Sequence, residues 1–80
     1  MEAQIYLIHD RIRVKTGSEY VYEGKEGTVL GAQWRGAEYI DYYVFVERPT
    51  LTPEQVDAGE DIKVNDYFVW LRANELEKVA

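Results

Sequence analysis

Hydrophobic and polar residues alternate with a period of two along most of the chain, which is typical of β-strands with one buried face. The segment from Arg11 to Lys15 shows this pattern, because Ile12 and Val14 alternate with basic residues. We expect the two aliphatic side chains to point into a core and the basic side chains to face water. This segment is predicted to be a strand.

The strongest strand signal lies at residues 39–47, where nearly every residue is a good β-former and neither Pro nor Gly interrupts the run. Val44 and Val46 are expected to point inward. The same face then includes Ile40 and Tyr42. The opposite face combines aromatic and acidic side chains: Tyr39, Asp41, Tyr43, Phe45 and Glu47.

Shorter segments predict the remaining elements. Strands are expected at residues 28–30, 67–71 and 76–79, with a candidate edge strand at 4–8. The connections are expected to be a long loop or irregular hairpin at 16–26, a bulge or bend at 31–36 and a tight turn at 73–75. In the segment 67–71, Val69 and Leu71 are expected inside. Phe68 and Trp70 then point to the other face.

One short helix or 3₁₀ turn is predicted at residues 53–58. Thr52 supplies a hydroxyl cap, Pro53 occupies the first helical position, and Gln55 stands where a capping box requires it. Gly59 follows where a left-handed residue would end the helix. We therefore expect one helical turn within a loop of a β domain.

So few short strands cannot bury one face of a flat sheet well, and bending them into a small barrel removes the exposed edges. The expected core consists of Ile12, Val14, Val29, Val44, Val46, Val69, Leu71, Leu76 and Val79. With 80 residues, the chain is expected to form a single all-β domain, residues 1–80, of about five antiparallel strands.

The order of these features over residues 10–79 resembles the SH3-like small barrels, including KOW-type domains. The resemblance rests on these runs: Arg11 to Lys15, Gly24 to Val29, Tyr43 to Val46, Val69 to Leu71 and Leu76 to Val79. Gly27-Thr28-Val29, preceded by Gly24-Lys25, is similar to the KOW core, in which a glycine allows a turn that no side chain could follow. The resemblance implies an SH3-like barrel.

Within these barrels, the chain also resembles the PsaE family of photosystem I subunits. The matching features are Arg13-Val14-Lys15, the aromatic pair Tyr20 and Tyr22, Gly27-Thr28-Val29, Tyr43 to Val46, and Val64-Asn65 before an aromatic strand. This resemblance, with the similar barrels of other subunits that dock ferredoxin, implies an accessory subunit that binds a protein. Ferredoxin docking implies a basic surface, whereas this chain has a net charge of −6 and an acidic stretch at residues 50–61.

Charge narrows the choice of partners. The chain carries 9 Lys and Arg residues against 15 Asp and Glu residues, and the second half is the more acidic. Four acids without an intervening base repel a phosphate backbone and favour a basic partner or plain solubility. They are Glu54, Asp57, Glu60 and Asp61. Binding of nucleic acid by the whole surface is therefore disfavoured.

Residues suited to catalysis are scarce. The chain has no cysteine, and His9 and Ser18 are its only histidine and serine. No spacing typical of a metal site, a nucleophilic triad or a phosphate-binding loop is present. We therefore expect no catalytic, cofactor-binding or metal site. The lack of cysteine, of a leader and of a long apolar stretch favours a cytoplasmic protein that does not insert into a membrane.

Aromatic residues in the long loop and on outward strand faces are the candidate binding residues, because Tyr and Trp provide large contact areas at interfaces. The predicted partner-binding residues are Tyr20, Tyr22, Trp34, Tyr43, Phe45 and Trp70. Two arrangements fit the pattern: the rings form an interface, or they form a secondary core under the loops. The pattern leaves the oligomeric state open.

Three functions fit the sequence. The first is a non-catalytic module or accessory subunit that binds a protein through an aromatic and acidic face. The second is a KOW-type nucleic-acid-associated module in transcription or translation, with a basic strip of Arg11, Arg13, Lys15, Lys25 and Arg35. The third is a small acidic inhibitor, of the type that viruses direct at a host nucleic-acid-binding protein, with residues 54–61 as its working part. We prefer the first.

Overall fold

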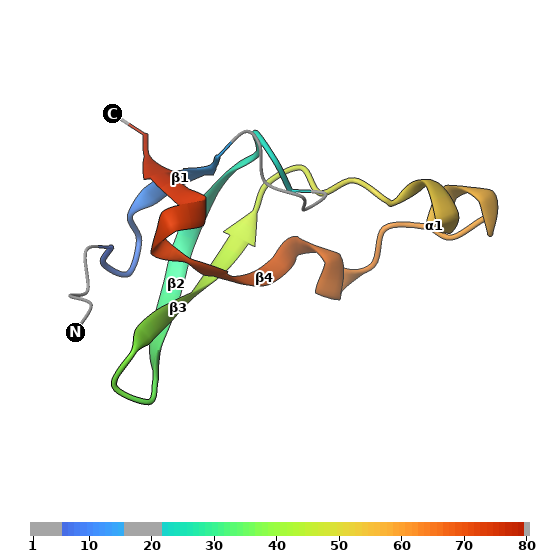
Figure 1. Cartoon of the computed structure of the whole chain (residues 1–80). Coiled ribbons are helices and arrows are strands. Elements are labelled where there is room, and N and C mark those ends of the chain that lie inside the picture. The colour runs from blue at the N-terminus through green and yellow to red at the C-terminus, as the bar shows by residue number, and fades with distance from the viewer. Residues whose placement is uncertain (1–5, 16–21, 80) are drawn as a thin grey trace.

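The computed structural model of the chain describes residues 6–15 and 22–79, which form one curled β-sheet with a projecting arm (Figure 1). The five antiparallel strands of these residues are β1 (Arg11–Val14), β2 (Glu26–Arg35), β3 (Tyr39–Val46), β4 (Phe68–Arg72) and β5 (Leu76–Lys78). The helical elements are α1 (Pro53–Asp57) and two 3₁₀ turns, η1 (Val64–Tyr67) and η2 (Ala73–Glu75). The prediction of an all-β domain is confirmed.

The sheet is curled rather than flat, as the short connection between its two edges shows. The strand order is β4-β3-β2-β1-β5, so β4 and β5 lie at opposite edges. In a flat sheet these edges would be about 19 Å apart, whereas the chain from Arg72 to Leu76 spans at most about 14 Å. η2 joins the two strands only because the sheet bends, as predicted for a small barrel.

The core fills the inner side of this curled sheet. Its buried residues are Tyr6, Ile12, Val14, Val29, Ile40, Tyr42, Val44, Val46, Leu71 and Leu76. In β3 every second residue is buried, which confirms the inward face predicted from the alternation. Two predicted core residues are only half-buried: Val69, which packs against the core, and Val79, which follows the end of β5.

Tyr6 is a core residue that the alternation did not predict. Its ring packs edge-on against Tyr42, with ring centroids 5.2 Å apart. Its hydroxyl donates a hydrogen bond to the main-chain oxygen of Leu76 at 3.0 Å. Tyr6 therefore ties the segment before β1 to the beginning of β5.

The expected edge strand at residues 4–8 is wrong for its described part. Leu7 and Ile8 are exposed, and the Leu7 N–H donates to an Asp10 carboxylate oxygen at 2.9 Å. His9 has a φ of +77°, which is incompatible with an extended strand. The Asp10 side chain therefore stabilises a turn that the apolar composition of the segment did not indicate.

β2 is longer than predicted and continues through the segment that was expected to bend. Its pairing with β3 shifts register between Val29 and Gly31, which is a bulge, and then resumes as far as Arg35. The turn itself lies at Gly36, whose φ is +62°. The predicted bend is thus a bulge followed by strand, because pairing with β3 holds this glycine-containing segment extended.

Gly27 lies inside β2 rather than at a turn, which corrects the expectation from the KOW resemblance. Its neighbours across the sheet are Ile12 in β1 and Val46 in β3. A Cβ atom at this position would lie 2.2 Å from the main-chain oxygen of Phe45, so no side chain fits. The turn lies at Gly24 instead, whose φ is +76°.

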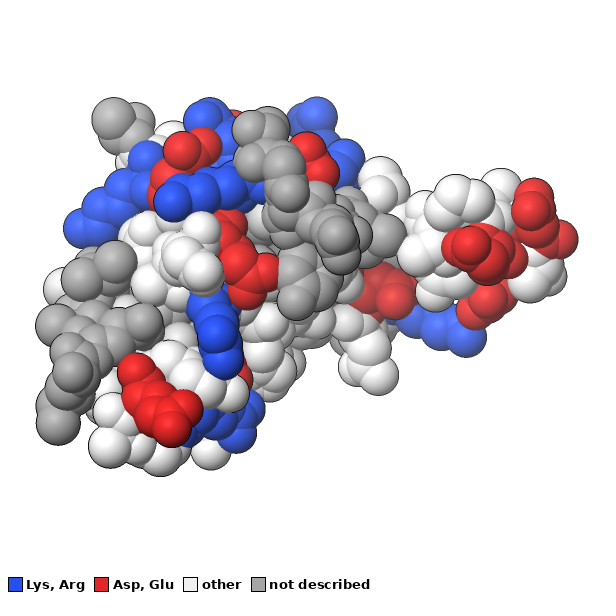
Figure 2. All heavy atoms as spheres, viewed as in Figure 1, with Lys and Arg blue, Asp and Glu red and all other residues white. Residues whose placement is uncertain are grey.

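Residues 50–63, here called the acidic arm, project from the barrel and carry α1 (Figure 1). The predicted capping box is present. The Gln55 N–H donates to the Thr52 hydroxyl oxygen at 3.2 Å, and the Thr52 N–H donates to the Gln55 side-chain oxygen at 2.9 Å. Gly59 follows the helix with a φ of +73°. No residue of α1 is buried, and Figure 2 shows acidic side chains gathered on the arm.

Candidate protein-binding face

Five aromatic rings form a row on the outer face of β3 and β4, and we call this row the aromatic ladder. In the order of their contacts, its members are Tyr67, Phe45, Phe68, Tyr43 and Trp70. Successive ring centroids lie 5.8, 5.6, 5.7 and 4.7 Å apart. Aromatic pairs attract one another at these separations. The ladder is therefore a continuous aromatic cluster outside the core.

The register of β3 and β4 explains why these rings meet. Two aromatic pairs lie directly opposite each other, namely Phe45 with Phe68 and Tyr43 with Trp70. The Glu47 N–H donates to the main-chain oxygen of Glu26 at 3.0 Å, so alternate residues before Glu47 also turn their main-chain groups toward β2. Both aromatic pairs therefore occupy non-hydrogen-bonded sites between β3 and β4, where opposite side chains approach most closely.

Two arginines border the Trp70 end of the ladder. The Arg35 guanidinium lies 5.4 Å from the Trp70 ring centroid, and its Nε donates to an Asp41 carboxylate oxygen at 2.7 Å. The Arg72 guanidinium lies 3.6 Å from the Tyr39 ring centroid. Each arginine thus makes a cation–π contact with a ring of this face. The ladder therefore ends in a group of mixed charge.

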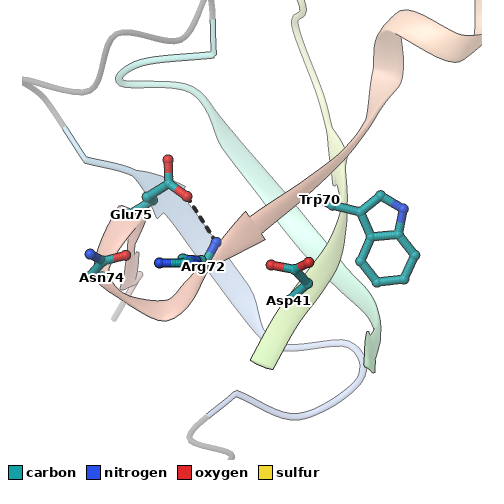
Figure 3. A pocket seen from close by; sticks show the side chains of 5 residues that line it. All are labelled: Asp41, Trp70, Arg72, Asn74 and Glu75. Carbon is teal, nitrogen blue, oxygen red and sulfur yellow. Dashed lines mark hydrogen bonds between the residues drawn. The ribbon is translucent and has the colours of Figure 1, made fainter. Parts of the chain in front are cut away.

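A shallow pocket of about 390 Å³ lies beside Trp70 at this end of the face. It is lined by Asp41, Trp70, Arg72, Asn74 and Glu75, and Figure 3 shows Asp41 between Arg72 and the Trp70 ring. The Arg72 N–H donates to the Glu75 carboxylate at 3.0 Å, which fixes η2 against the end of β4. Two carboxylates and one guanidinium give the lining a net negative charge.

The rings of the ladder differ in how far they are exposed. Trp70 is 43% exposed, whereas the other four are half-buried and pack on one another. None of the five belongs to the buried core cluster. The inner rings thus support one another as a small secondary cluster, and Trp70 presents aromatic surface to the solvent.

The predicted binding residues do not form one surface. Three of them belong to the ladder: Tyr43, Phe45 and Trp70. Trp34 is 46% exposed but lies opposite Ile40, so it points to the other side of the β2–β3 pair. The bulge after Val29 is the reason, because one extra residue reverses the alternation of faces along the rest of β2.

Tyr22 is likewise not part of the ladder. It is half-buried against the core, and its hydroxyl donates to the main-chain oxygen of Asp66 at 3.0 Å. Burial, with a smaller contribution from the Asp66 charge, raises the pKa of Tyr22. Tyr22 therefore attaches the loop before β2 to η1. Tyr20 lies outside the described residues.

Several residues of the face were not among the predicted binding residues. Phe68 carries a usable signal, because it shares the outward alternation of Trp70. Tyr67 carries none, because it reaches the face only through the turn of η1. Arg35 and Arg72 become neighbours of the rings only through the register of three strands, which the alternation along one segment does not contain.

The predicted basic strip is interleaved with carboxylates on the outer face of the sheet. Across β5, β1, β2 and the residue after β3, the order of charges is Glu77, Arg13, Glu26, Arg11 and Glu47. The Arg11–Glu47 pair is the shortest, with 2.6 Å between nitrogen and oxygen. The hydrogen bond from Arg11 lowers the pKa of Glu47. Because three carboxylates accompany two guanidinium groups, this row is not a cationic surface.

The described residues were also compared with the requirements of a metal site and of a membrane span. Within residues 6–15 and 22–79, no group of three His, Cys, Asp or Glu side chains lies where it could hold a metal ion. In the same part of the chain, no helix is long and apolar enough to cross a membrane. His9 lies exposed in the turn before β1.

No protein-family model, curated protein or solved structure matches this chain. The fold described above therefore rests on the strands, their register and the buried core. The resemblance to SH3-like barrels and to the PsaE family of photosystem I subunits stays a prediction from sequence.

Proposed function

We propose that this protein is a non-catalytic interaction module, an accessory subunit that binds a protein partner through the aromatic ladder and the charged groups beside it. The observation that carries the proposal is the placement of Trp70, 43% exposed at the end of a packed row of rings. A ring held in this way adds contact area without ordering a flexible side chain on binding, as aromatic hot spots do.

Charge favours a protein over a nucleic acid as the partner. Nucleobases also stack on aromatic faces, but binding their phosphates requires cations that are available beside the rings. Arg35 is bonded to Asp41, and Arg11 and Arg13 lie among carboxylates. With a net charge of −6, the chain is better suited to a protein whose surface is basic or mixed.

The fold family and compartment belong to the same proposal. The order of strand segments and the turn before the last strand support an SH3-like, KOW-like barrel. The absence of cysteine supports a reducing compartment such as the cytoplasm. An accessory subunit of a larger assembly is the role that this resemblance implies.

The test compares three proteins in affinity capture from the source cell, followed by calorimetry with the purified partner. Trp70→Ala is expected to weaken binding by more than about tenfold, because aromatic anchors at interfaces contribute about 2 kcal/mol or more. Trp34→Ala is the matched control, since it removes the same side chain at similar exposure from the other side of the sheet. It is expected to bind like the wild type.

Two results would contradict the proposal. One is unchanged binding by Trp70→Ala, and the other is a loss confined to Trp34→Ala. A salt-sensitive affinity for RNA or DNA that depends on Arg35 or Arg72 would favour the KOW-type nucleic-acid function instead.

The acidic arm favours a second candidate, the acidic inhibitor of a nucleic-acid-binding protein. The arm carries four acids outside the barrel, and three aliphatic side chains on it or just after it are exposed: Val56, Ile62 and Val64. Acidic and apolar groups together suit a basic groove. Replacing Glu54, Asp57, Glu60 and Asp61 by their amides should abolish such inhibition, and inhibition that survives the change excludes this function.

A further inference from the structure

The main-chain groups of Trp70 point to the open edge of the sheet. Among the described strands β4 has one neighbour, β3, and the pairing of Glu47 with Glu26 directs the main-chain groups of Val44 toward β4. Val69 lies opposite Val44 and therefore turns its own groups toward β3. Because the direction alternates along a strand, the N–H and C=O of Trp70 face away from β3.

The two 3₁₀ turns close the edge on either side of Trp70. The Phe68 N–H donates to the main-chain oxygen of Asn65 in η1. The Arg72 N–H donates to the Glu75 carboxylate in η2 at 3.0 Å. Both donors that share the direction of the Trp70 N–H are thus satisfied within the chain. The edge is therefore open at one residue, which defines a single register for anything that pairs with it.

The surface beside this opening indicates what pairs with it. A strand residue opposite Trp70 points its side chain to the outer face, next to the exposed indole. The residue two positions along then reaches the pocket lined by the Asp41 and Glu75 carboxylates, whose net charge is negative. A lysine or arginine complements this lining, and the charge of −6 on the whole chain acts in the same direction.

We propose that an extended segment of the partner protein, with basic side chains at alternate positions, adds to the β4 edge as a further strand. The Trp70 N–H and C=O form two main-chain hydrogen bonds with it. Its basic side chains lie along the outer face beside the indole and in the pocket of Asp41 and Glu75. This mode of recognition is β-strand addition, in which main-chain bonds provide affinity and alternate pockets provide specificity. It rests on the proposed protein-binding function.

The test uses two isomeric synthetic peptides that alternate valine and lysine and carry blocked termini. In the proposed register the lysine amides face β4 and the valine amides face solvent. N-methylation of the valine nitrogens therefore leaves the hydrogen bonds to Trp70 intact, whereas N-methylation of the lysine nitrogens removes one of them. The two peptides have the same charge, size and side chains, so electrostatic or apolar docking does not distinguish them.

Amide NMR of the whole protein provides the readout. The valine-methylated peptide is expected to shift the Trp70 amide resonance and to slow its hydrogen exchange by about tenfold or more. The lysine-methylated peptide is expected to have at least about tenfold lower affinity, the effect of one lost bond of about 1.5 kcal/mol. Equal binding of the two, or no response at Trp70 with either at millimolar concentration, overturns strand addition.

The outcome for the proposed function is separate. If Trp70→Ala weakens capture of the natural partner while the two peptides bind alike, the aromatic face is correct and strand addition is wrong. If Trp70→Ala leaves the natural partner bound, the proposed function fails whatever the peptides do. A Glu75→Gln variant, which leaves the rings unchanged, should weaken binding of the valine-methylated peptide without affecting the folded state.

Discussion

Tyr43 and Trp70 lie directly opposite each other across β3 and β4, with ring centroids 4.7 Å apart, at a site where no main-chain bond joins the strands. Because the two rings contact each other rather than the core, their interaction energy can be measured separately. In a double-mutant cycle of Tyr43→Ala and Trp70→Ala, we expect a coupling of about 0.5–1.5 kcal/mol in the free energy of unfolding.

The control for that cycle pairs Trp70→Ala with Trp34→Ala. These two residues point to opposite sides of the sheet, so their effects on stability should add. Urea denaturation of the single and double variants supplies all the required free energies. Additive effects at Tyr43 and Trp70 would show that the ladder is not an energetic unit.

Gly27 and Gly31 provide a matched pair of glycine substitutions within β2. Gly27→Ala places a methyl group 2.2 Å from the main-chain oxygen of Phe45, whereas Gly31→Ala places one in open space. We expect Gly27→Ala to destabilise the fold by about 2–4 kcal/mol or to prevent folding, through overpacking of the sheet. Gly31→Ala should change stability by less than about 1 kcal/mol. Similar thermal midpoints for the two variants would contradict the register of β2 and β3.

Alkaline pH should destabilise the protein through two tyrosines. Burial raises the pKa of Tyr6 and of Tyr22 above the ordinary value, with Tyr42 and Asp66 as smaller causes. The folded state therefore holds these protons more tightly than the unfolded state. Their contribution to stability is complete below about pH 10 and is lost as pH rises through the raised pKa values of the folded state.

The variant Tyr6→Phe/Tyr22→Phe tests this dependence. It should lose less stability than the wild type between neutral and strongly alkaline pH, as measured by urea denaturation. At neutral pH it should be less stable by about 1–3 kcal/mol, because the hydrogen bonds to Leu76 and Asp66 are missing. An unchanged alkaline slope would show that these phenols do not control the transition.

The acidic arm should be dispensable for folding. α1 contains no buried residue, and the buried Pro49 and the η1 contact with Tyr22 lie outside residues 53–62. Replacing residues 53–62 by a short Gly-Ser linker should change the free energy of unfolding by less than about 1 kcal/mol. A circular-dichroism melt measures the effect. Loss of the folded state would show that the arm packs on the barrel.

Alternation along the chain was sufficient where a strand is regular and paired on both sides. β3 is the clear case, because its inward and outward residues follow the period of two without exception. The capping box at Thr52 and Gln55 was also readable, since all its partners lie within one helical turn. The fold class and the Tyr43, Phe45 and Trp70 part of the ladder follow from such local signals.

The errors arise where a distant residue decides the structure. Tyr6 is buried because Tyr42 and Leu76 receive it, and neither is near it in sequence. Trp34 was placed on the wrong side because a bulge shifts the register, and a bulge needs both strands to be recognised. The arginines beside the ladder were missed for the same reason, since cross-strand neighbours do not appear in the pattern of a single segment.

The antiparallel pairing of β1 with β5 joins residues 12–14 to residues 76–78. Such a distant pairing carries a large loop-closure entropy and slows folding, because local contacts cannot substitute for it. On the ribosome, β1 emerges early but acquires its second neighbour only after Lys78 has left the exit tunnel. Until then Ile12 and Val14 await the Leu76 side chain, so the nascent β1–β2–β3 meander is exposed to chaperones and to aggregation.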